Sequence, residues 1–228
     1  MNIVVTGAGK GIGLELCKKF LQQESNKVIA ISRNIENLKE LQEKYINLCP
    51  VSFDLTNEVY TPIIEKLSFF EEKKTDILIN NAGLLIKKPF DKLSRADNNK
   101  MFAVNFHAPF QMIQTLLPFI SDNAHIVNIS SMGGFQGSEK FQGLTGYSAS
   151  KAALAILTEC LAAELKEKKI SINCLCLGSV KTEMLQKAFP GYNAAVNATQ
   201  MADFIADFAC KAHRHMNGKI IPVSLSTP

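Results

Sequence analysis

The sequence predicts an α/β fold in which one doubly wound, seven-stranded parallel sheet is flanked by helices. Short apolar runs alternate along the chain with longer stretches whose apolar residues recur at helical spacing, a pattern typical of such sheets. The length of 228 residues suits one domain. No linker-like, repeated or low-complexity segment interrupts the pattern, so we expect residues 1–228 to form a single domain.

The alternation defines the individual elements. Strands are expected near residues 2–6, 27–32, 49–54, 76–80, 125–130, 170–176 and 219–223. Helices are expected near residues 11–23, 35–45, 57–70, 95–120, 147–168 and 198–213. Because right-handed crossovers join parallel strands, a ligand crevice is expected at the carboxyl ends of the strands.

Composition and charge limit the partners. Hydrophobic residues make up 46% of the chain and charged residues 20%, which is ordinary for a globular protein. No apolar run reaches the ~18 residues needed to span a bilayer. The net charge of +4 is mild, and both signs mix in clusters such as residues 71–74. We therefore expect no membrane and no nucleic-acid partner.

The six cysteines have neither metal-ligand nor disulfide-framework spacing. Cys174 and Cys176 would point to the same face of a strand, where a metal pair is one interpretation, but their apolar setting favours buried free thiols. For His213 and His215 we favour solvated histidines over a metal site, because we expect no carboxylate or cysteine to act as a partner of this pair. Free thiols, and no leader-like segment after Met1, predict a cytoplasmic protein without bound metal.

A glycine-rich stretch, Thr6-Gly7-Ala8-Gly9-Lys10-Gly11-Ile12-Gly13, lies between the first predicted strand and the first predicted helix. Its glycines permit a tight turn that brings backbone N–H groups and the helix N-terminus against a pyrophosphate. A merely permissive turn is the alternative. The position between a strand and a helix favours the loop of a Rossmann-type, dinucleotide-binding domain.

Arg33 follows the second predicted strand, where an acidic side chain would bind the ribose 2′-hydroxyl of NAD. Together with Lys10 in the glycine-rich loop, Arg33 would pair with the additional 2′-phosphate of NADP. The alternative is that both cations are solvated at the surface. These residues favour NADP(H) as the coenzyme.

Polar residues follow the next three predicted strands. Asp54 closes the third strand, Asn80-Asn81-Ala82-Gly83 closes the fourth, and Ser130-Ser131 follows the fifth. Taken singly, Asp54 would be a helix cap and the asparagines turn formers. Together they would lie at the sheet edge that faces the ligand.

Asn105 lies four residues before Pro109 in the long predicted helix. Proline has no N–H to donate to the Asn105 carbonyl oxygen, which leaves that oxygen free to hold a water. A helix that only kinks at Pro109 is the alternative.

Tyr147 and Lys151 lie four positions apart in the helical stretch that begins at Gly146, so their side chains share one face. An ammonium group within reach stabilises an ionised phenol and lowers its pKa, which makes the pair an acid/base group. This spacing also occurs by chance, so its meaning depends on the motifs that accompany it.

The ordered set of motifs resembles that of the short-chain dehydrogenase/reductase family over nearly the whole chain. The set consists of Thr6-Gly7-x-x-x-Gly11-x-Gly13, Asn80-Asn81-Ala82-Gly83, Asn105, Ser131 and Tyr147-x-x-x-Lys151. The resemblance implies an NADP(H)-dependent oxidoreductase that transfers hydride between NADPH and a carbonyl or secondary alcohol. By resemblance, Tyr147 is the general acid/base and Ser131 holds the substrate oxygen. Lys151 would lower the tyrosine pKa and bind the nicotinamide ribose, and Asn105 would hold a water in a proton relay.

The resemblance also implies the coenzyme contacts and the partners. Coenzyme contacts are expected at Gly7, Gly9, Lys10, Gly11, Ile12, Gly13, Ser32, Arg33, Asp54, Leu55, Asn81, Ala82, Gly83, Tyr147, Lys151, Gly178, Val180 and Thr182. The implied partners are a small-molecule carbonyl or alcohol substrate and further copies of the chain in a homodimer or homotetramer.

Four features depart from the family pattern. Residues 132–146 contain a small insertion beside the substrate, and Leu177-Gly178 replaces the family's Pro-Gly. The substrate-lid region, residues 183–197, is short, and residues 221–228 lack the usual Val-Asp-Gly-Gly ending.

The alternative function is a non-catalytic NADP(H)-binding sensor or an interaction protein of the same fold. Candidates for an apolar substrate wall, or equally for core or interface residues, are Phe135, Phe141, Leu144, Phe189 and Tyr192.

Overall fold

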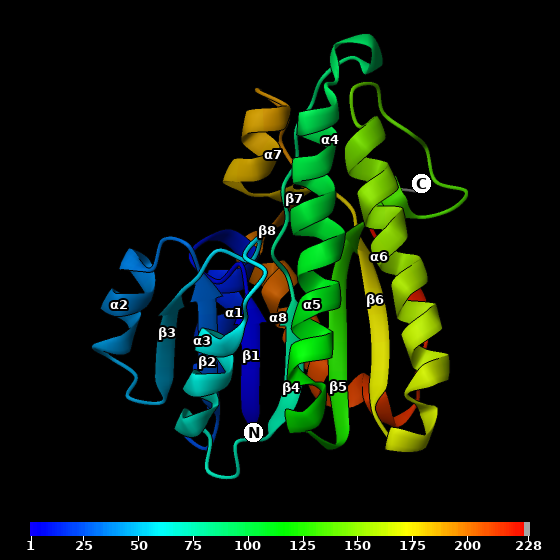
Figure 1. The fold of residues 1–228 in the computed structure, drawn as a ribbon. Coiled ribbons are helices and arrows are strands. Elements are labelled where there is room, and N and C mark those ends of the chain that lie inside the picture. Colours follow the sequence, from blue (N-terminus) through cyan, green and yellow to red (C-terminus); the bar gives the residue numbers. More distant parts are fainter. Residues whose placement is uncertain (226–228) are drawn as a thin grey trace.

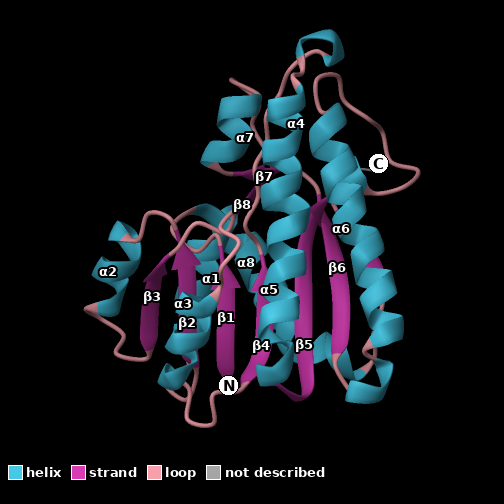
Figure 2. Ribbon diagram, viewed as in Figure 1, coloured by secondary structure: helices cyan, strands magenta, loops and turns pink. Residues whose placement is uncertain are grey.

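The computed structural model describes residues 1–225, and within that range the main sheet has seven parallel strands (Figures 1 and 2). Residues 226–228, the end of the C-terminal sequence considered above, lie outside the described range. The strand order in the sheet is β3-β2-β1-β4-β5-β6-β9. From β1 the chain adds strands first on one side, as β2 and β3, and then on the other side, beginning with β4. This order confirms the predicted doubly wound fold. The strands are β1 (Asn2–Thr6), β2 (Lys27–Ser32), β3 (Leu48–Ser52), β4 (Thr75–Asn80), β5 (Ile120–Ser131), β6 (Ser171–Leu177) and β9 (Ile220–Val223).

Helices cover both faces of this sheet (Figure 1). One face carries α1 (Gly11–Leu21), α2 (Glu36–Gln42) and α8 (Ala198–Lys211). The other carries α3 (Thr61–Lys66), α5 (Ala108–Leu116) and α6 (Thr145–Glu164), with α4 (Arg95–Phe102) leading toward α5.

Strand β1 shows why the sequence of each strand is an unbroken run of apolar residues. Its side chains alternate between the two faces, and both faces are buried. Ile3 and Val5 belong to the core cluster that contains Leu16 of α1, whereas Val4 belongs to the cluster that contains Met112 of α5. The period of two is therefore hidden in the sequence, because neither face is polar.

The long helix predicted over residues 95–120 is divided in the structure. α4 is followed by a π-helical turn over Ala103–His107, then by α5 and a 3₁₀ turn over Leu117–Phe119. Pro109 lies in the first turn of α5, where its missing N–H breaks no helical hydrogen bond. The break between α4 and α5 therefore accommodates Pro109, which would interrupt the hydrogen bonds of a continuous helix.

Other boundaries also move. The helix predicted over residues 57–70 is α3 followed by a 3₁₀ turn, and Asp54 lies beyond the end of β3 rather than within it.

The region 183–197 contains α7 (Glu183–Ala188), which was not predicted. α7 lies between β7 (Val180–Lys181) and β8 (Val196–Asn197), two short strands that pair in parallel. Figure 1 shows α7 beyond the carboxyl ends of the main-sheet strands.

No helix in the described range is long and apolar enough to cross a membrane.

A buried histidine connects β5, β6 and α8. The Asn173 Oδ1 accepts a hydrogen bond of 3.0 Å from the Lys219 N–H, so the Asn173 amide nitrogen faces the His125 ring and donates to Nε2 at 2.9 Å. Nδ1 therefore carries the ring proton and donates to the Ala209 carbonyl at 2.9 Å. The His213 ring lies 5.7 Å from the His125 ring. His213 is thus half-buried, not the solvated histidine that we expected.

Acid is expected to destabilise the protein through His125. Burial lowers the pKa of His125 from 6.5 to about 4, so the unfolded chain takes up the proton first as pH falls. The free energy of unfolding should drop between pH 6.5 and 4 by about 3 kcal/mol from this group. Urea titrations at several pH values test this, since His125→Gln should flatten the pH dependence and exposed His107→Gln should not. Equal slopes for all three proteins would contradict the assignment.

Candidate active site

The glycine-rich loop is held against the end of β4 by close backbone packing. Gly7 has φ +66°, and a Cβ atom there would lie 2.7 Å from the Ala82 Cα. A Cβ atom at Gly13 would lie 2.3 Å from the Gly7 carbonyl oxygen. Asn81 Nδ2 donates to the carbonyl oxygens of Thr6 at 3.0 Å and Gly7 at 3.2 Å. Asn81 and Ala82, predicted as coenzyme contacts, thus also fix the loop that would carry the coenzyme.

The loop presents the N-terminus of α1 to the cleft. In the part of the chain that the structure describes, no side chain caps α1 and no acidic residue lies in its first turn. The first N–H groups of a helix have no partners inside the helix, and the helix dipole favours an anion there. With Gly11 at φ +57°, the backbone forms a cradle that fits a pyrophosphate.

The loop also contacts the end of β2, next to Arg33. A Cβ atom at Gly9 would lie 2.5 Å from both the Ser32 Oγ and the Asn34 carbonyl oxygen. The pKa of Asp54 is lowered mainly by two hydrogen bonds from Thr56, and the charge of Arg33 lowers it by a smaller amount. Ser32, Arg33, Asp54 and the Lys10 side of the loop therefore share one end of the cleft.

The Tyr147 phenol is held close to Ser131. Gly146 allows the start of α6 to pack tightly, since a Cβ atom there would lie 2.5 Å from the Met101 Cε. Tyr147, the next residue, is 9% exposed, and the Ser131 side chain lies close enough to its phenol to lower the phenol's pKa. The Ser131 Oγ also accepts from the Gly133 N–H at 3.2 Å. Ser130 points elsewhere, and its Oγ donates to the Lys151 carbonyl oxygen at 2.9 Å.

Lys151 is buried one helical turn after Tyr147. Its Nζ donates to the Ile129 carbonyl oxygen at 2.7 Å. Burial lowers the pKa of Lys151 to about 8, against the smaller opposing effect of Cys174 and Cys176. Both cysteines lie buried in β6 with free thiols.

The pKa of Tyr147 differs from the expectation. Burial raises the pKa of the Tyr147 phenol, and the Ser131 side chain opposes that effect only in part. Lys151 was expected to lower this pKa, but its ammonium instead donates to the Ile129 carbonyl oxygen at 2.7 Å. The phenol therefore stays protonated at neutral pH in this structure, the form required of an acid.

Asn105 lies in the π-helical turn and binds through its side chain. Its Oδ1 accepts from the Leu84 N–H at 2.7 Å, and its Nδ2 donates to the Leu84 carbonyl at 2.9 Å and to the Ser150 Oγ at 2.9 Å. Ser150 in turn donates to the Tyr147 carbonyl oxygen at 2.8 Å. Asn105 therefore connects the segment after β4 to the turn of α6 that carries Tyr147. This contact was not foreseen, because only the backbone carbonyl was considered.

One cleft of about 970 Å³ brings the predicted residues together. All predicted catalytic and coenzyme-binding residues line it except Gly13 and Asn105, which lie behind the lining. Of the candidate wall residues, Phe141, Leu144, Phe189 and Tyr192 line the cleft. Phe135 instead packs against the buried cluster that contains Cys174 and Cys176. Sequence reasoning missed Leu84, Leu85 and the side chains of α7, which carry no motif.

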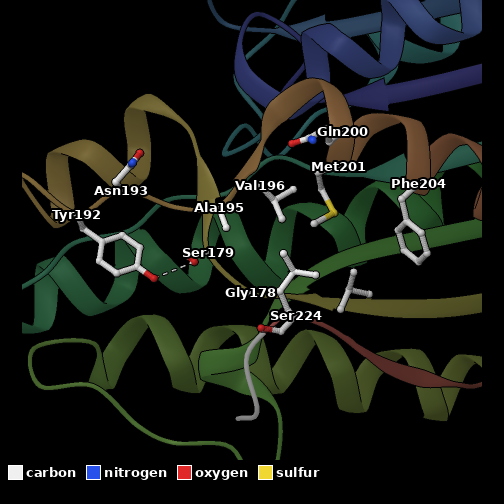
Figure 3. Close-up of a pocket in the computed structure, with 12 residues that line it drawn as sticks. Gly178, Ser179, Tyr192, Asn193, Ala195, Val196, Gln200, Met201, Phe204 and Ser224 are labelled. Carbon is white, nitrogen blue, oxygen red and sulfur yellow. Dashed lines mark hydrogen bonds between the residues drawn. The ribbon is translucent and has the colours of Figure 1, made fainter.

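A smaller cavity of about 400 Å³ adjoins this cleft. The two share Gly178, Ser179, Tyr192 and Ser224 as walls. Figure 3 shows a hydrogen bond between the hydroxyls of Tyr192 and Ser179, two residues that line the smaller cavity. The two oxygen atoms lie 3.1 Å apart.

Comparison with known proteins agrees with this geometry. A family model described as short chain dehydrogenase matches residues 1–193. An uncharacterised oxidoreductase of Staphylococcus aureus (strain MW2) is 28% identical over 226 residues, which cover 96% of this chain and 95% of that protein. The structure of a 4-hydroxyisoleucine dehydrogenase complexed with NADH is 28% identical, with a TM-score of 0.85 over 98% of this chain and 96% of that one. ElxO with NADP bound is 26% identical, with a TM-score of 0.83 and the same coverages, 98% and 96%.

The fold and these matches define an oxidoreductase of the doubly wound α/β class. The chain belongs to the short-chain dehydrogenase family, because the family model matches well over half of it.

Proposed function

We propose that the protein is an NADP(H)-dependent carbonyl reductase or alcohol dehydrogenase with Tyr147 as its general acid/base. The observation that carries the proposal is that Ser131 and Tyr147 line the same cleft as the glycine-rich loop, with the Ser131 side chain beside the phenol. A buried lysine, Lys151, lies beside this pair in the same cleft. Such a set positions a carbonyl oxygen and supplies its proton.

The residues divide the reaction between them. When bound, the nicotinamide supplies or accepts the hydride. In reduction, Ser131 donates a hydrogen bond to the substrate oxygen, and the Tyr147 phenol gives that oxygen its proton as the carbonyl carbon gains the hydride. The Lys151 ammonium stabilises the phenolate that forms. Oxidation reverses both transfers. Gly178, Val180 and Thr182, which line the cleft after β6, would hold the nicotinamide end.

The coenzyme assignment rests on the residues at the other end of the cleft. The two solved structures described above contain different coenzymes, NADH in one and NADP in the other. Arg33 and Lys10 both line the cleft here. An arginine in place of a carboxylate after β2 favours a ligand with a 2′-phosphate.

Self-association is part of the proposal. Phe110 of α5 and Ile156 of α6 are 42% and 56% exposed. Exposed large apolar side chains on two helices that cover the same side of the sheet favour a homodimer or homotetramer built through these helices.

Carbonyl reduction is expected to slow above about pH 8. Lys151 has a folded-state pKa of about 8, so it is charged below that pH and loses its charge above it. Without the ammonium, the phenolate that forms on Tyr147 is less stable, and kcat for reduction should fall. Measuring kcat from pH 6 to 9.5 at saturating NADPH tests this. A flat profile to pH 9.5 would contradict the role of Lys151.

The test of the function is a screen of NADPH oxidation by the purified protein. The panel should contain ketones, 3-oxoacyl thioesters, sugars and ketosteroids, with NADH measured in parallel. Turnover with at least one carbonyl supports the proposal. Tight NADPH binding without turnover across the panel would instead identify a non-catalytic sensor.

A further inference from the structure

We infer that Glu183 is a coenzyme-selectivity residue, whose carboxylate competes with the 2′-phosphate of NADP(H) for the Lys10 ammonium. The inference rests on the proposed function, because it takes Lys10 and Arg33 as the partners of that phosphate. It adds a residue of α7, outside every motif that the sequence displays.

The contact joins two fixed backbone positions. Lys10 Nζ lies 2.5 Å from Glu183 Oε2, and both residues line the large cleft. Lys10 is the residue immediately before α1, and Glu183 is the first residue of α7. The two segments are in contact, since a Cβ atom at Gly11 would lie 3.7 Å from the Thr182 Cγ2. Thr182 in turn caps α7 by accepting from the Leu185 N–H at 3.3 Å.

The charges make the contact a competition. The hydrogen bond and charge of Lys10 lower the pKa of Glu183 below its usual value, so its carboxylate is ionised at neutral pH. One ammonium group near two anions must divide its hydrogen bonds between them. NADH has a neutral 2′-hydroxyl, so it does not take part in this competition. Repulsion between Glu183 and the pyrophosphate acts on both coenzymes and cancels in the ratio of their affinities.

The strength of the effect is limited by exposure. Both side chains are 61% exposed, and ion pairs at such sites are weak because water screens them. We therefore expect Glu183→Gln to raise the preference for NADPH over NADH by roughly two- to fivefold. α7 should keep its place in the variant, because its far end is held by Lys87, whose Nζ lies 3.9 Å from the Phe189 ring centroid.

Dissociation constants of NADPH and NADH, measured by fluorescence titration without substrate, test the inference. Asp203→Asn is the matched control. It removes a carboxylate of α8 from another exposed ion pair, whose partner is Lys19 Nζ of α1 at 2.8 Å, but neither residue lines the cleft. The control should leave the NADPH/NADH ratio unchanged. An unchanged or reduced NADPH preference in Glu183→Gln would overturn the inference.

A second variant separates this inference from the proposed function. Lys10→Met should reduce the NADPH preference, and Glu183→Gln added to it should then have no effect on the ratio. If Lys10→Met reduces the preference but Glu183→Gln does not raise it, the competition is absent and the phosphate contact stands. If Lys10→Met leaves the ratio unchanged, Lys10 does not bind the phosphate, and both the contact and the inference fail.

Discussion

Replacing Tyr147 by phenylalanine is expected to lower kcat for NADPH-dependent carbonyl reduction by roughly 10²- to 10⁴-fold. The substitution removes the phenolic hydroxyl, the proton donor that lies beside Ser131 in the cleft. The ring itself, which is 9% exposed and packed at the start of α6, stays in place. NADPH affinity should therefore fall by no more than about tenfold, because a single hydrogen bond is the most that binding loses.

Tyr192→Phe is the matched control for this substitution. Tyr192 also lines the cleft, and its hydroxyl bonds to the Ser179 Oγ at 3.1 Å, so the control removes a phenolic oxygen from the same cleft. It should keep kcat within a fewfold of the natural protein. If Tyr147→Phe retains more than a tenth of the natural kcat, Tyr147 is not the proton donor. Steady-state kinetics and NADPH titration together distinguish loss of chemistry from loss of binding.

The fold was predictable because its signals are local and repeated. Each apolar run in β1, β2 and β4 is buried on both faces, and each is followed by turn residues and a helical pattern. The secondary structure of the segment between residues 95 and 131 was harder to predict from the sequence. The π-helical turn at Ala103–His107 and the early start of β5 at Ile120 depend on contacts with distant parts of the chain, which spacing along the sequence does not reveal.

The candidate site was predictable to the extent that motifs mark strand ends. The carboxyl ends of β1, β2, β4, β5 and β6 meet at one cleft, and the residues that follow them line it. The pKa shifts and ion pairs within the site were not predictable from the sequence. The pKa of Tyr147 depends on how deeply the fold buries the phenol and on where the Lys151 ammonium points. The pairing of Lys10 with Glu183 joins residues 173 positions apart, so neither residue alone indicated it.

Replacing Arg33 by aspartate is expected to shift the ratio of NADPH to NADH affinity toward NADH by roughly 10- to 200-fold. A charged hydrogen bond to the 2′-phosphate is lost, and a carboxylate at this position repels the phosphate while accepting from the 2′-hydroxyl of NADH. The backbone of Arg33 is fixed by its carbonyl oxygen, which accepts from the Ser52 Oγ at 3.1 Å. The new carboxylate would thus occupy the same end of the cleft.

The argument for Arg33 depends on position as well as charge, so the control reverses a charge elsewhere. Arg214 is exposed beyond α8 and does not line the cleft. Arg214→Asp changes the net charge of the protein by the same amount, and long-range effects on coenzyme affinity should be small and equal for NADPH and NADH. A shift in the ratio confined to Arg33→Asp supports direct contact with the 2′-phosphate. Equal shifts in both variants, or none in either, would contradict that contact and leave the end of β2 without a role in coenzyme choice.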